Sequence, residues 1–327
     1  MIIVTGGAGF IGSALIWKLN KHGYDKIIVV DELGKSEKWK NLNGLSFADF
    51  IHKDDFIGMV LQRKINFKVD AIFHLGACSS TTETDADYLI DNNFHYSQEL
   101  AKFSLENGNR FIYASSAATY GDGSFGYIDD EDNLESLRPL NMYGYSKHLF
   151  DLWIKRNKLL DKVVGLKYFN VYGPNEYHKE DMRSVVHKAF EQVKDYGKVK
   201  LFKSYNPNFK DGEQKRDFVY VKDAVDMTLF FLDNKNVNGI FNVGTGNAQT
   251  WIELVTALFD SMNKPLNIEF IDMPEEIKSK YQYFTQANLT KIRDAGYDKP
   301  IMNVQNGVKD YVKNYLLKNS YLGLSRD

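Results

Sequence analysis

The sequence predicts an α/β protein built on a doubly wound parallel sheet, with a smaller lobe interwoven with it. Short apolar runs rich in β-branched residues recur along the first half of the chain. Each run is followed by a segment whose apolar residues have helical spacing. Strands that alternate with helices imply crossover connections and a parallel sheet that is covered on both faces.

The first half contains five expected strands and three expected helices. The strands are the apolar runs Ile2 to Thr5, Ile27 to Asp31, Ala71 to Leu75, Phe111 to Ser115 and Val163 to Phe169. The helices are the periodic segments Ile11 to Lys21, Tyr88 to Asn107 and Tyr145 to Leu159.

After residue 174 the alternation stops and the chain becomes polar and lysine-rich. The expected helices of this half are Met182 to Asp195, a segment capped by Asp223 that runs to Leu232, and Trp251 to Met262. The expected strands are 217–221 and 240–243. No flexible linker separates the halves, so we expect the second lobe to be woven into the first.

Composition excludes several classes of protein. In the 327 residues, 41 basic side chains against 43 acidic ones give a formal charge of −2, which provides no electrostatic case for binding nucleic acid or an anionic membrane. The single cysteine, Cys78, excludes an intramolecular disulfide framework. The chain contains no 18-residue apolar stretch and no basic leader before an apolar one, so we expect a cytoplasmic protein that does not bind membranes.

Three glycines directly after the first strand indicate a phosphate-binding turn. Gly6, Gly9 and Gly12 have the spacing G-x-x-G-x-x-G and open the first helix. Glycines here permit a tight turn and close approach of a pyrophosphate to the helix N-terminus. Asp31 ends the next strand, about 20 residues on, where a ribose-binding carboxylate belongs. The pattern is typical of a Rossmann dinucleotide-binding domain.

The residues alone leave the choice between NAD and NADP open. Asp31 favours NAD, because a carboxylate repels the additional 2′-phosphate of NADP. Four lysines that follow could instead bind such a phosphate or form a solvated surface. They are Lys35, Lys38, Lys40 and Lys53.

A candidate catalytic group follows the glycine turn. Tyr143 and Lys147 lie four residues apart on an expected helix, so the ammonium is expected to lower the pKa of the phenol towards neutrality. Ser116 lies at the end of an expected parallel strand, at the sheet edge where ligands bind, and could hydrogen-bond a substrate oxygen. A tyrosinate beside a nicotinamide can take a hydroxyl proton while hydride leaves the same carbon.

Motifs along nearly the whole chain resemble those of one enzyme family. They are TGGAGFIGS at 5–13, VVDEL at 29–33, FHLGACSSTTE at 73–83, YASSAATYG at 113–121, NMYGYSK at 141–147, YFNVYGPNEYHK at 168–179, KRDFVYVKD at 215–223 and FNVGTG at 241–246. The chain resembles the extended short-chain dehydrogenase/reductases that modify nucleotide-linked sugars, and most closely those that epimerise ADP-linked heptose. GACSSTTE and the stretch 170–179 are far more specific than the glycine motif.

The resemblance implies an isomerase with NADP as its cofactor. Its NADP-binding Rossmann domain would comprise 1–170 plus about 216–245, and its substrate-binding lobe 171–215 and 246–327. Besides the three glycines, the residues expected at the cofactor are Phe10, Ile11, Asp31, Glu32, Lys38, Lys53, Leu75, Gly76, Ala77, Cys78, Ser79, Asn92, Tyr143, Lys147, Val171 and Lys179. Tyr143 and Lys179 match the two proton-transfer residues, and Ser116 the substrate-polarising hydroxyl.

The resemblance also implies a set of contacts to an ADP-sugar. The matching residues are Asn170, Asp181, His187, Lys188, Phe202, Lys203, Ser204, Tyr205, Arg216 and Tyr281. Asp181 replaces a usual serine, Lys188 replaces a usual histidine with His187 one residue earlier, and the loop 206–213 is lengthened. Glu32 replaces a more familiar neutral residue, which keeps NAD open as the alternative cofactor.

The implied reaction inverts C6'' of ADP-D-glycero-D-manno-heptose to the L-glycero epimer. An unactivated carbon that bears a hydroxyl cannot be inverted by proton exchange, so oxidation, rotation of the ketone and return of hydride are needed. The product would supply heptose for the lipopolysaccharide core. The resemblance implies a homo-oligomer, often a pentamer.

Alternatives remain on the same scaffold and outside it. A 4-epimerase needs only Ser116, Tyr143 and Lys147, whereas a 4,6-dehydratase would need an acidic pair where Ala117 and Ala118 stand. A dinucleotide-binding redox sensor is the non-enzymatic alternative. No metal site is expected, because the histidine spacing is wrong and the acidic run 129–132, expected to be a solvated loop, lacks EF-hand spacing.

Overall fold

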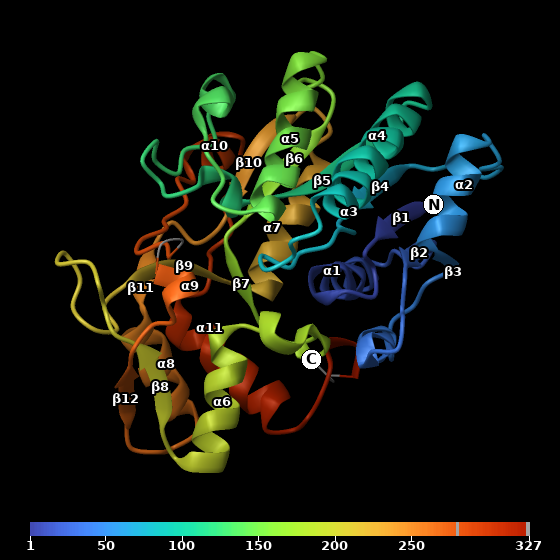
Figure 1. Cartoon of the computed structure of the whole chain (residues 1–327). Coiled ribbons are helices and arrows are strands. Elements are labelled where there is room, and N and C mark those ends of the chain that lie inside the picture. Colours follow the sequence, from blue (N-terminus) through green and yellow to red (C-terminus); the bar gives the residue numbers. More distant parts are fainter. Residues whose placement is uncertain (279–280, 325–327) are drawn as a thin grey trace.

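A seven-stranded, fully parallel sheet forms the centre of the molecule (Figure 1). The computed structural model describes residues 1–278 and 281–324. The strand order is β10-β6-β5-β4-β1-β2-β3, so the order reverses between β1 and β4. The strands are β1 (Ile2–Thr5), β2 (Ile27–Asp31), β3 (Asp49–His52), β4 (Ala71–His74), β5 (Arg110–Ser116), β6 (Val164–Tyr168) and β10 (Gly239–Val243). This is the expected doubly wound sheet, whose reversal point is where ligands bind.

Helices cover both faces of the sheet because successive strand residues point to opposite sides. Ile2 and Val4 pack in the core cluster that contains α1 (Phe10–Lys21) and α7 (Val221–Asp233). Ile3 packs in the cluster of the other face. The helices of that face are α2 (Lys53–Leu61), α4 (Tyr96–Glu106) and α5 (Met142–Arg156).

The smaller lobe lies below the sheet in Figure 1 and is built from segments of the second half. Its longer helices are α6 (Val185–Tyr196), α8 (Trp251–Ser261) and α11 (Val304–Asp310). Its strands are β7 (Asn170–Tyr172), β9 (Lys215–Tyr220) and β11 (Ala248–Thr250) in one sheet, and β8 (Val199–Phe202) and β12 (Ile268–Ile271) in another. Its apolar residues belong to the same core cluster as α1 and α7.

Short helices complete the structure. They are η1 (Glu37–Leu42), α3 (Ala86–Leu89), η2 (Ile90–His95), η3 (Ala117–Tyr120), η4 (Glu131–Ser136), η5 (Tyr177–Met182), α9 (Glu275–Lys278), α10 (Thr290–Asp294), η6 (Tyr311–Leu316) and η7 (Leu322–Leu324). The chain crosses between the sheet and the lobe several times. Residues 279–280 and 325–327 of the expected lobe lie outside the described residues. The exact division into two domains therefore stays a prediction.

Two local expectations were wrong. Asp223 does not cap α7, because the helix starts directly from β9 with Tyr220 as its N-cap. Asp223 instead accepts a hydrogen bond from the backbone N–H of Met302 (3.0 Å), and burial raises its pKa to about 6. The acidic run 129–132 is not simply solvated: Asp129 is buried and accepts from the N–H of Asn242 (2.8 Å).

Sequence periodicity missed β3 and α2. β3 is a half-exposed edge strand, Asp49-Phe50-Ile51-His52, without an apolar run. Within residues 1–278 and 281–324, no helix is long and apolar enough to cross a bilayer. Over the same residues no group of three or more histidine, cysteine, aspartate or glutamate side chains could hold a metal ion.

One buried carboxylate fastens the β9 strand to the turn after β10. Asp217 is fully buried and accepts hydrogen bonds from the N–H and hydroxyl of Thr245 (2.7 and 2.8 Å). It also accepts from the N–H groups of Gly246 (2.9 Å) and Ala287 (3.0 Å). Burial raises the pKa of Asp217, and these hydrogen bonds oppose that shift. The carboxylate thereby joins the sheet to the lobe.

We expect Asp217→Ala to lower the free energy of unfolding by about 3 kcal/mol, because three backbone N–H groups lose their acceptor. Denaturant unfolding would measure the change. Asp233→Ala, at the exposed end of α7, is the matched control and should change the same free energy by less than about 0.5 kcal/mol. Equal stability of the two variants would contradict this role of Asp217.

Candidate active site

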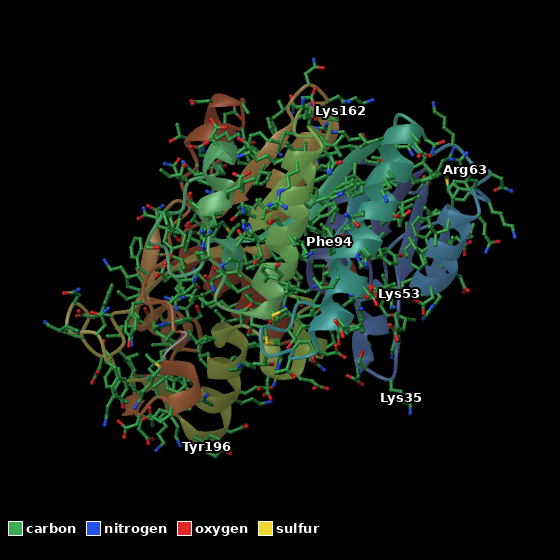
Figure 2. All side chains as sticks on the ribbon, turned by 45° about the horizontal axis from the view of Figure 1, so that its top comes forward. Lys35, Lys53, Arg63, Phe94, Lys162 and Tyr196 are labelled. Atoms are coloured by element: carbon green, nitrogen blue, oxygen red, sulfur yellow. The ribbon has the colours of Figure 1, made fainter. Side chains whose placement is uncertain are left out.

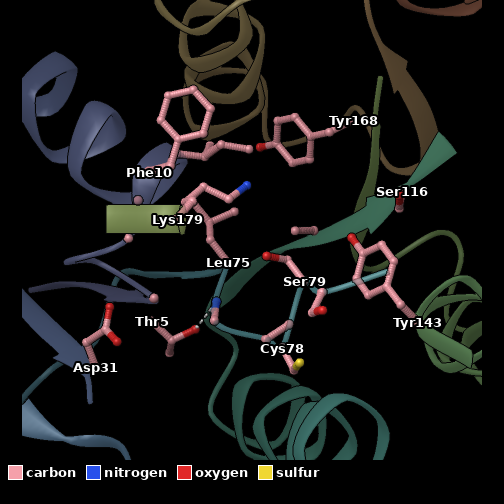
Figure 3. Close-up of a pocket in the computed structure, with 18 of the residues that line it drawn as sticks. Thr5, Phe10, Asp31, Leu75, Cys78, Ser79, Ser116, Tyr143, Tyr168 and Lys179 are labelled. Atoms are coloured by element: carbon pink, nitrogen blue, oxygen red, sulfur yellow. Dashed lines mark hydrogen bonds between the residues drawn. The ribbon is translucent and has the colours of Figure 1, made fainter. Parts of the chain in front are cut away.

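A cavity of about 640 Å³ opens at the carboxyl ends of the central strands (Figure 3). Its walls come from the turns after β1, β2 and β4, the end of β5, the start of α5, and the segment from β6 to η5. Because carboxyl ends of parallel strands meet at one edge, residues far apart in sequence converge there. This cavity contains the reversal point of the sheet.

The glycine turn has the geometry that the sequence predicted. Gly6 has φ of +66°, and a Cβ there would lie 2.6 Å from the backbone N of Gly76. A Cβ on Gly12 would collide with the carbonyl oxygen of Gly6. No side chain caps the N-terminus of α1, whose N-cap is Gly9. The turn thus leaves the free N–H groups and the space that a pyrophosphate needs.

Asp31 ends β2 as expected and is almost fully buried. Its carboxylate accepts from the N–H groups of Ala8 (2.8 Å) and Glu32 (2.7 Å), which ties the glycine turn to β2. Lys38 forms an ion pair with it at 2.5 Å. The Asp31 carboxylate and the Lys38 ammonium therefore lie together at the end of the cavity next to β2.

The basic run divides into two groups. Lys38 and Lys53 line the cavity, and the Lys53 ammonium lies 3.7 Å from the Glu32 carboxylate. Lys35 and Lys40 do not line the cavity. Lys35 is exposed and projects away from the molecule (Figure 2), and Lys40 pairs with Glu37 at 2.6 Å.

The loop 75–79 after β4 is fixed by a side chain that sequence analysis missed. Buried Asn93 accepts from the N–H of Cys78 and donates to its carbonyl oxygen, both at 2.9 Å. It also donates to the hydroxyl of Ser146 on α5 (3.0 Å). Asn93 thereby holds the loop against the helix that carries Tyr143 and Lys147. An Asn-Asn pair inside an otherwise helical pattern was the available signal.

A chain of four hydrogen bonds also supports the loop 75–79. Ser97 donates its hydroxyl proton to the carbonyl of Asn93 (2.6 Å), so it accepts from Nε2–H of His74 (2.8 Å). Nδ1 of His74 then accepts from the hydroxyl of Thr5 (2.7 Å), which itself accepts from the N–H of Gly76 (3.1 Å). Burial lowers the pKa of His74 to about 3, so the ring is neutral.

Ser116, Tyr143 and Lys147 come together at one side of the cavity. Ser116 ends β5, and the other two lie one turn apart on α5. A hydrogen bond joins Tyr143 and Ser116, and it lowers the pKa of the phenol. The Lys147 ammonium donates to the carbonyl of Ala114 (2.9 Å).

The expected effect of Lys147 on Tyr143 was wrong for this structure. Burial raises the pKa of Tyr143, and Lys147 is not among the causes of its shift. Burial also lowers the pKa of Lys147 to about 8, since an ammonium loses hydration in this position. The Lys147 ammonium is directed at the backbone carbonyl of Ala114 instead of at the phenol.

Lys179 projects into the cavity from the side opposite Tyr143 (Figure 3). It belongs to η5, and its ammonium lies 5.6 Å from the centre of the Phe10 ring at the start of α1. Burial lowers its pKa, and the charge of Glu176 raises it. Two groups able to transfer protons thus face the cavity from opposite walls.

Every residue expected at the cofactor lines this cavity, as does Ser116. Further lining residues were not expected from the sequence. They are Thr5, Val30, Ser80, Tyr88, Tyr96, Ala114, Ser115, Tyr168, Phe169, His178 and Met182. Most of them lie within one or two residues of an expected one, which is the signal that could have found them.

Of the residues expected at an ADP-sugar, only Asn170 lines the cavity. The others lie in the lobe: Asp181, His187, Lys188, Phe202, Lys203, Ser204, Tyr205, Arg216 and Tyr281.

Part of this set forms an aromatic and basic cluster. The Arg216 guanidinium is buried against the rings of Tyr281 (5.1 Å) and Trp251 (5.8 Å). Tyr205 is exposed and donates to Asp272 (2.9 Å).

His187, in contrast, is buried against Tyr177 and lies 3.2 Å from the Arg183 guanidinium. Its position in the lobe is that of a packed side chain.

The model of the NAD dependent epimerase/dehydratase family matches residues 2–244. An ADP-L-glycero-D-manno-heptose-6-epimerase of Nitratidesulfovibrio vulgaris is 55% identical over 316 residues, 97% of this chain and 98% of its own. One of Fusobacterium nucleatum is 50% identical over 332 residues, 98% of this chain and 100% of its own.

Solved structures agree with these relatives. The Helicobacter pylori ADP-L-glycero-D-manno-heptose-6-epimerase has a TM-score of 0.81 at 30% identity, covering 95% of this chain and 94% of its own. The Thermotoga maritima UDP-glucose 4-epimerase, solved with UDP-glucose, has a TM-score of 0.78 at 26% identity, covering 98% of this chain and 99% of its own. Sequence, fold and cavity therefore lead to one conclusion: the chain belongs to the NAD dependent epimerase/dehydratase family, within the group of ADP-L-glycero-D-manno-heptose-6-epimerases.

Proposed function

We propose that this protein inverts C6'' of ADP-D-glycero-D-manno-heptose to give the L-glycero epimer, with NADP as its bound cofactor. Two near full-length relatives at 55% and 50% identity carry the name of this activity. The observation that carries the proposal is the pair Tyr143 and Lys179, which face one cavity from opposite walls (Figure 3). Inversion needs a proton-transfer group for each face of the reacting carbon.

The cavity fits a dinucleotide, because the glycine turn leaves space and free N–H groups where a pyrophosphate would lie. When bound, the dinucleotide supplies the acceptor and donor of hydride. Ser116 holds the substrate oxygen, and Tyr143 exchanges its proton with that oxygen in one epimer. Lys179 does the same for the other epimer, after the ketone has rotated.

The raised pKa of Tyr143 and the lowered pKa of Lys179 suit this exchange. A neutral phenol can return a proton to the oxygen, and a lysine whose pKa is lowered by burial releases its proton more readily than an exposed one. Lys147, whose pKa is about 8, orients the site through the carbonyl of Ala114.

NADP is the proposed cofactor because Lys38 and Lys53 line the end of the cavity next to Asp31. Their ammonium groups are suited to a 2′-phosphate. NAD is the alternative, since Asp31 and Glu32 place two carboxylates at the same end.

The remaining assignments complete the proposal. The substrate is an ADP-linked heptose bound between the cavity and the lobe residues around Arg216 and Tyr281, and the product feeds the lipopolysaccharide core. The resemblance to the family supports a homo-oligomer.

The direct experiment is to denature the purified protein, identify the released dinucleotide by mass, and incubate native protein with ADP-D-glycero-D-manno-heptose. Bound NADP and conversion to the L-glycero epimer without added cofactor are the expected results. Bound dinucleotide without conversion would reject this substrate and favour a 4-epimerase on another nucleotide sugar. Failure with every nucleotide sugar would favour the redox sensor.

Tyr143→Phe should lower kcat at least about 100-fold while dinucleotide binding is kept, because the proton-transfer hydroxyl is lost. Steady-state turnover and the mass of the bound dinucleotide would be measured together. The control is Tyr145→Phe on the same helix, whose ring is 45% exposed and outside the cavity lining, and it should retain activity. Retained turnover in Tyr143→Phe would exclude the tyrosine as the catalytic group.

Lys179→Met should impair proton transfer for one epimer by about 100-fold and leave oxidation of the other partly intact. Single-turnover reduction of the bound dinucleotide, started separately from each epimer, would reveal the asymmetry. Lys194→Met, at an exposed position of α6, is the control. Unchanged rates from both epimers would make Lys179 a non-catalytic lysine.

Lys38→Ala should reduce affinity for NADP relative to NAD by about 10-fold, through loss of a charge-assisted hydrogen bond to the 2′-phosphate. Binding of both dinucleotides to stripped protein would be measured by calorimetry. Lys40→Ala removes a neighbouring ammonium that pairs with Glu37 outside the cavity, and its affinity ratio should not change. An equal loss of both affinities in Lys38→Ala would contradict 2′-phosphate recognition.

A further inference from the structure

The loop that carries Lys179 is closed by one buried carboxylate. Glu176 is only 1% exposed. Its Oε1 accepts from the N–H of Gly173 (3.3 Å) and the hydroxyl of Ser184 (2.7 Å), and its Oε2 accepts from the N–H of Ser184 (2.5 Å). Gly173 precedes the loop and Ser184 is the N-cap of α6. Both ends of the segment 173–184 are therefore bound to the same side chain.

The loop needs such a closure because its backbone is strained next to the lysine. Glu180 has φ of 47° and ψ of −122°, and η5 is kinked at this residue. Residues with a side chain rarely adopt positive φ, and they do so only where the surroundings fix them. The hydrogen bonds of Glu176 to Ser184 hold the far end of this kink.

Glu176 also lies on the same side of the turn as Lys179. The N–H of Lys179 donates to the carbonyl of Glu176 (3.0 Å), so the two residues are one 3-10 turn apart. Side chains three residues apart in such a turn eclipse one another. The two residues are therefore neighbours in the loop, with the carboxylate directed at Gly173 and Ser184 and the ammonium in the cavity near Phe10.

The charges of the two residues act on each other. Burial lowers the pKa of Lys179 and raises that of Glu176, while each group opposes the shift of its partner. Within the described ranges, Glu176 is the one charged group that shifts Lys179.

The other titratable groups that face Glu176 are the hydroxyls of Tyr177 and, from η6, Tyr311. Burial raises both of their pKa values, so they are neutral at working pH and do not replace its charge.

We propose that Glu176 is a positioning residue for Lys179: it closes the loop that carries the lysine and supplies the buried negative charge that keeps the ammonium protonated. The proton-transfer role of Lys179 rests on the proposed function, whereas the coupling of the two charges does not depend on it. The proposal is therefore tested first by a measurement that needs no substrate.

The first experiment measures the titration of Lys179 by competitive acetylation with acetic anhydride over a range of pH, with peptide mass spectrometry of the native protein as isolated. Because Glu176 holds the pKa of Lys179 up, Glu176→Gln should lower the titration midpoint of Lys179 by about one pH unit or more. Glu180→Gln removes an exposed carboxylate from the same loop and should not move it. Equal midpoints in wild type and Glu176→Gln overturn the proposal.

Glu176→Asp covers the case in which the glutamine variant does not fold. It keeps the charge but shortens the side chain, so the midpoint of Lys179 should remain within about half a pH unit of wild type. A midpoint that falls in Glu176→Asp by more than about one unit shows that the charge does not hold the ammonium, and it contradicts the proposal.

Activity provides the second readout. In Glu176→Gln, kcat should fall about 10-fold with KM within about twofold, and the alkaline limb of the pH profile should move to lower pH, since the protonated lysine is lost earlier. Glu176→Asp should recover the position of that limb. A lower kcat with an unmoved limb reduces Glu176 to a structural residue. Absence of epimerisation in wild type contradicts the proposed function and leaves the acetylation result to decide this inference.

Discussion

The geometry of the site depends on a buried ion pair beneath it. Asp151 of α5 and Lys167 of β6 are 0% and 1% exposed and lie 2.9 Å apart. The hydroxyls of Ser115 (2.7 Å) and Tyr113 (2.9 Å), both from β5, also donate hydrogen bonds to the Asp151 carboxylate. A buried pair is tolerated only when such hydrogen bonds offset the desolvation of both charges. The network fixes α5 against β5, and therefore Tyr143 and Lys147 against Ser116.

The same burial determines the electrostatics of the cavity. It lowers the pKa of His74 to about 3, of His178 to about 4 and of Lys147 to about 8, and it raises the pKa of Tyr143. Near neutral pH these two imidazoles and the phenol are uncharged. At that pH a pKa of about 8 leaves most of Lys147 protonated, so the side of the cavity next to Tyr143 keeps a positive charge.

The second wall of the cavity depends on contacts between distant segments. Asn175 donates to Ser13 of α1 (2.9 Å) and accepts from the N–H of Leu322 (3.0 Å) near the chain end. Tyr177 donates to the carbonyl of Ser320 (2.8 Å). The position of Lys179, two residues further on, is thus set jointly by the first helix and the last turns of the chain.

The sequence by itself determined the sheet, the glycine turn with Asp31, and the grouping of Ser116, Tyr143 and Lys147, because strand and helix periods and local motifs carry this information. Only the tertiary structure decided which way the pKa of Tyr143 shifts, since that depends on burial and on the contact of Lys147 with Ala114. It alone also revealed the roles of Asn93, Asp217 and Glu176. The sequence assigned no role to any of these three polar residues, because their hydrogen bonds arise only when distant backbone groups are brought to them by folding.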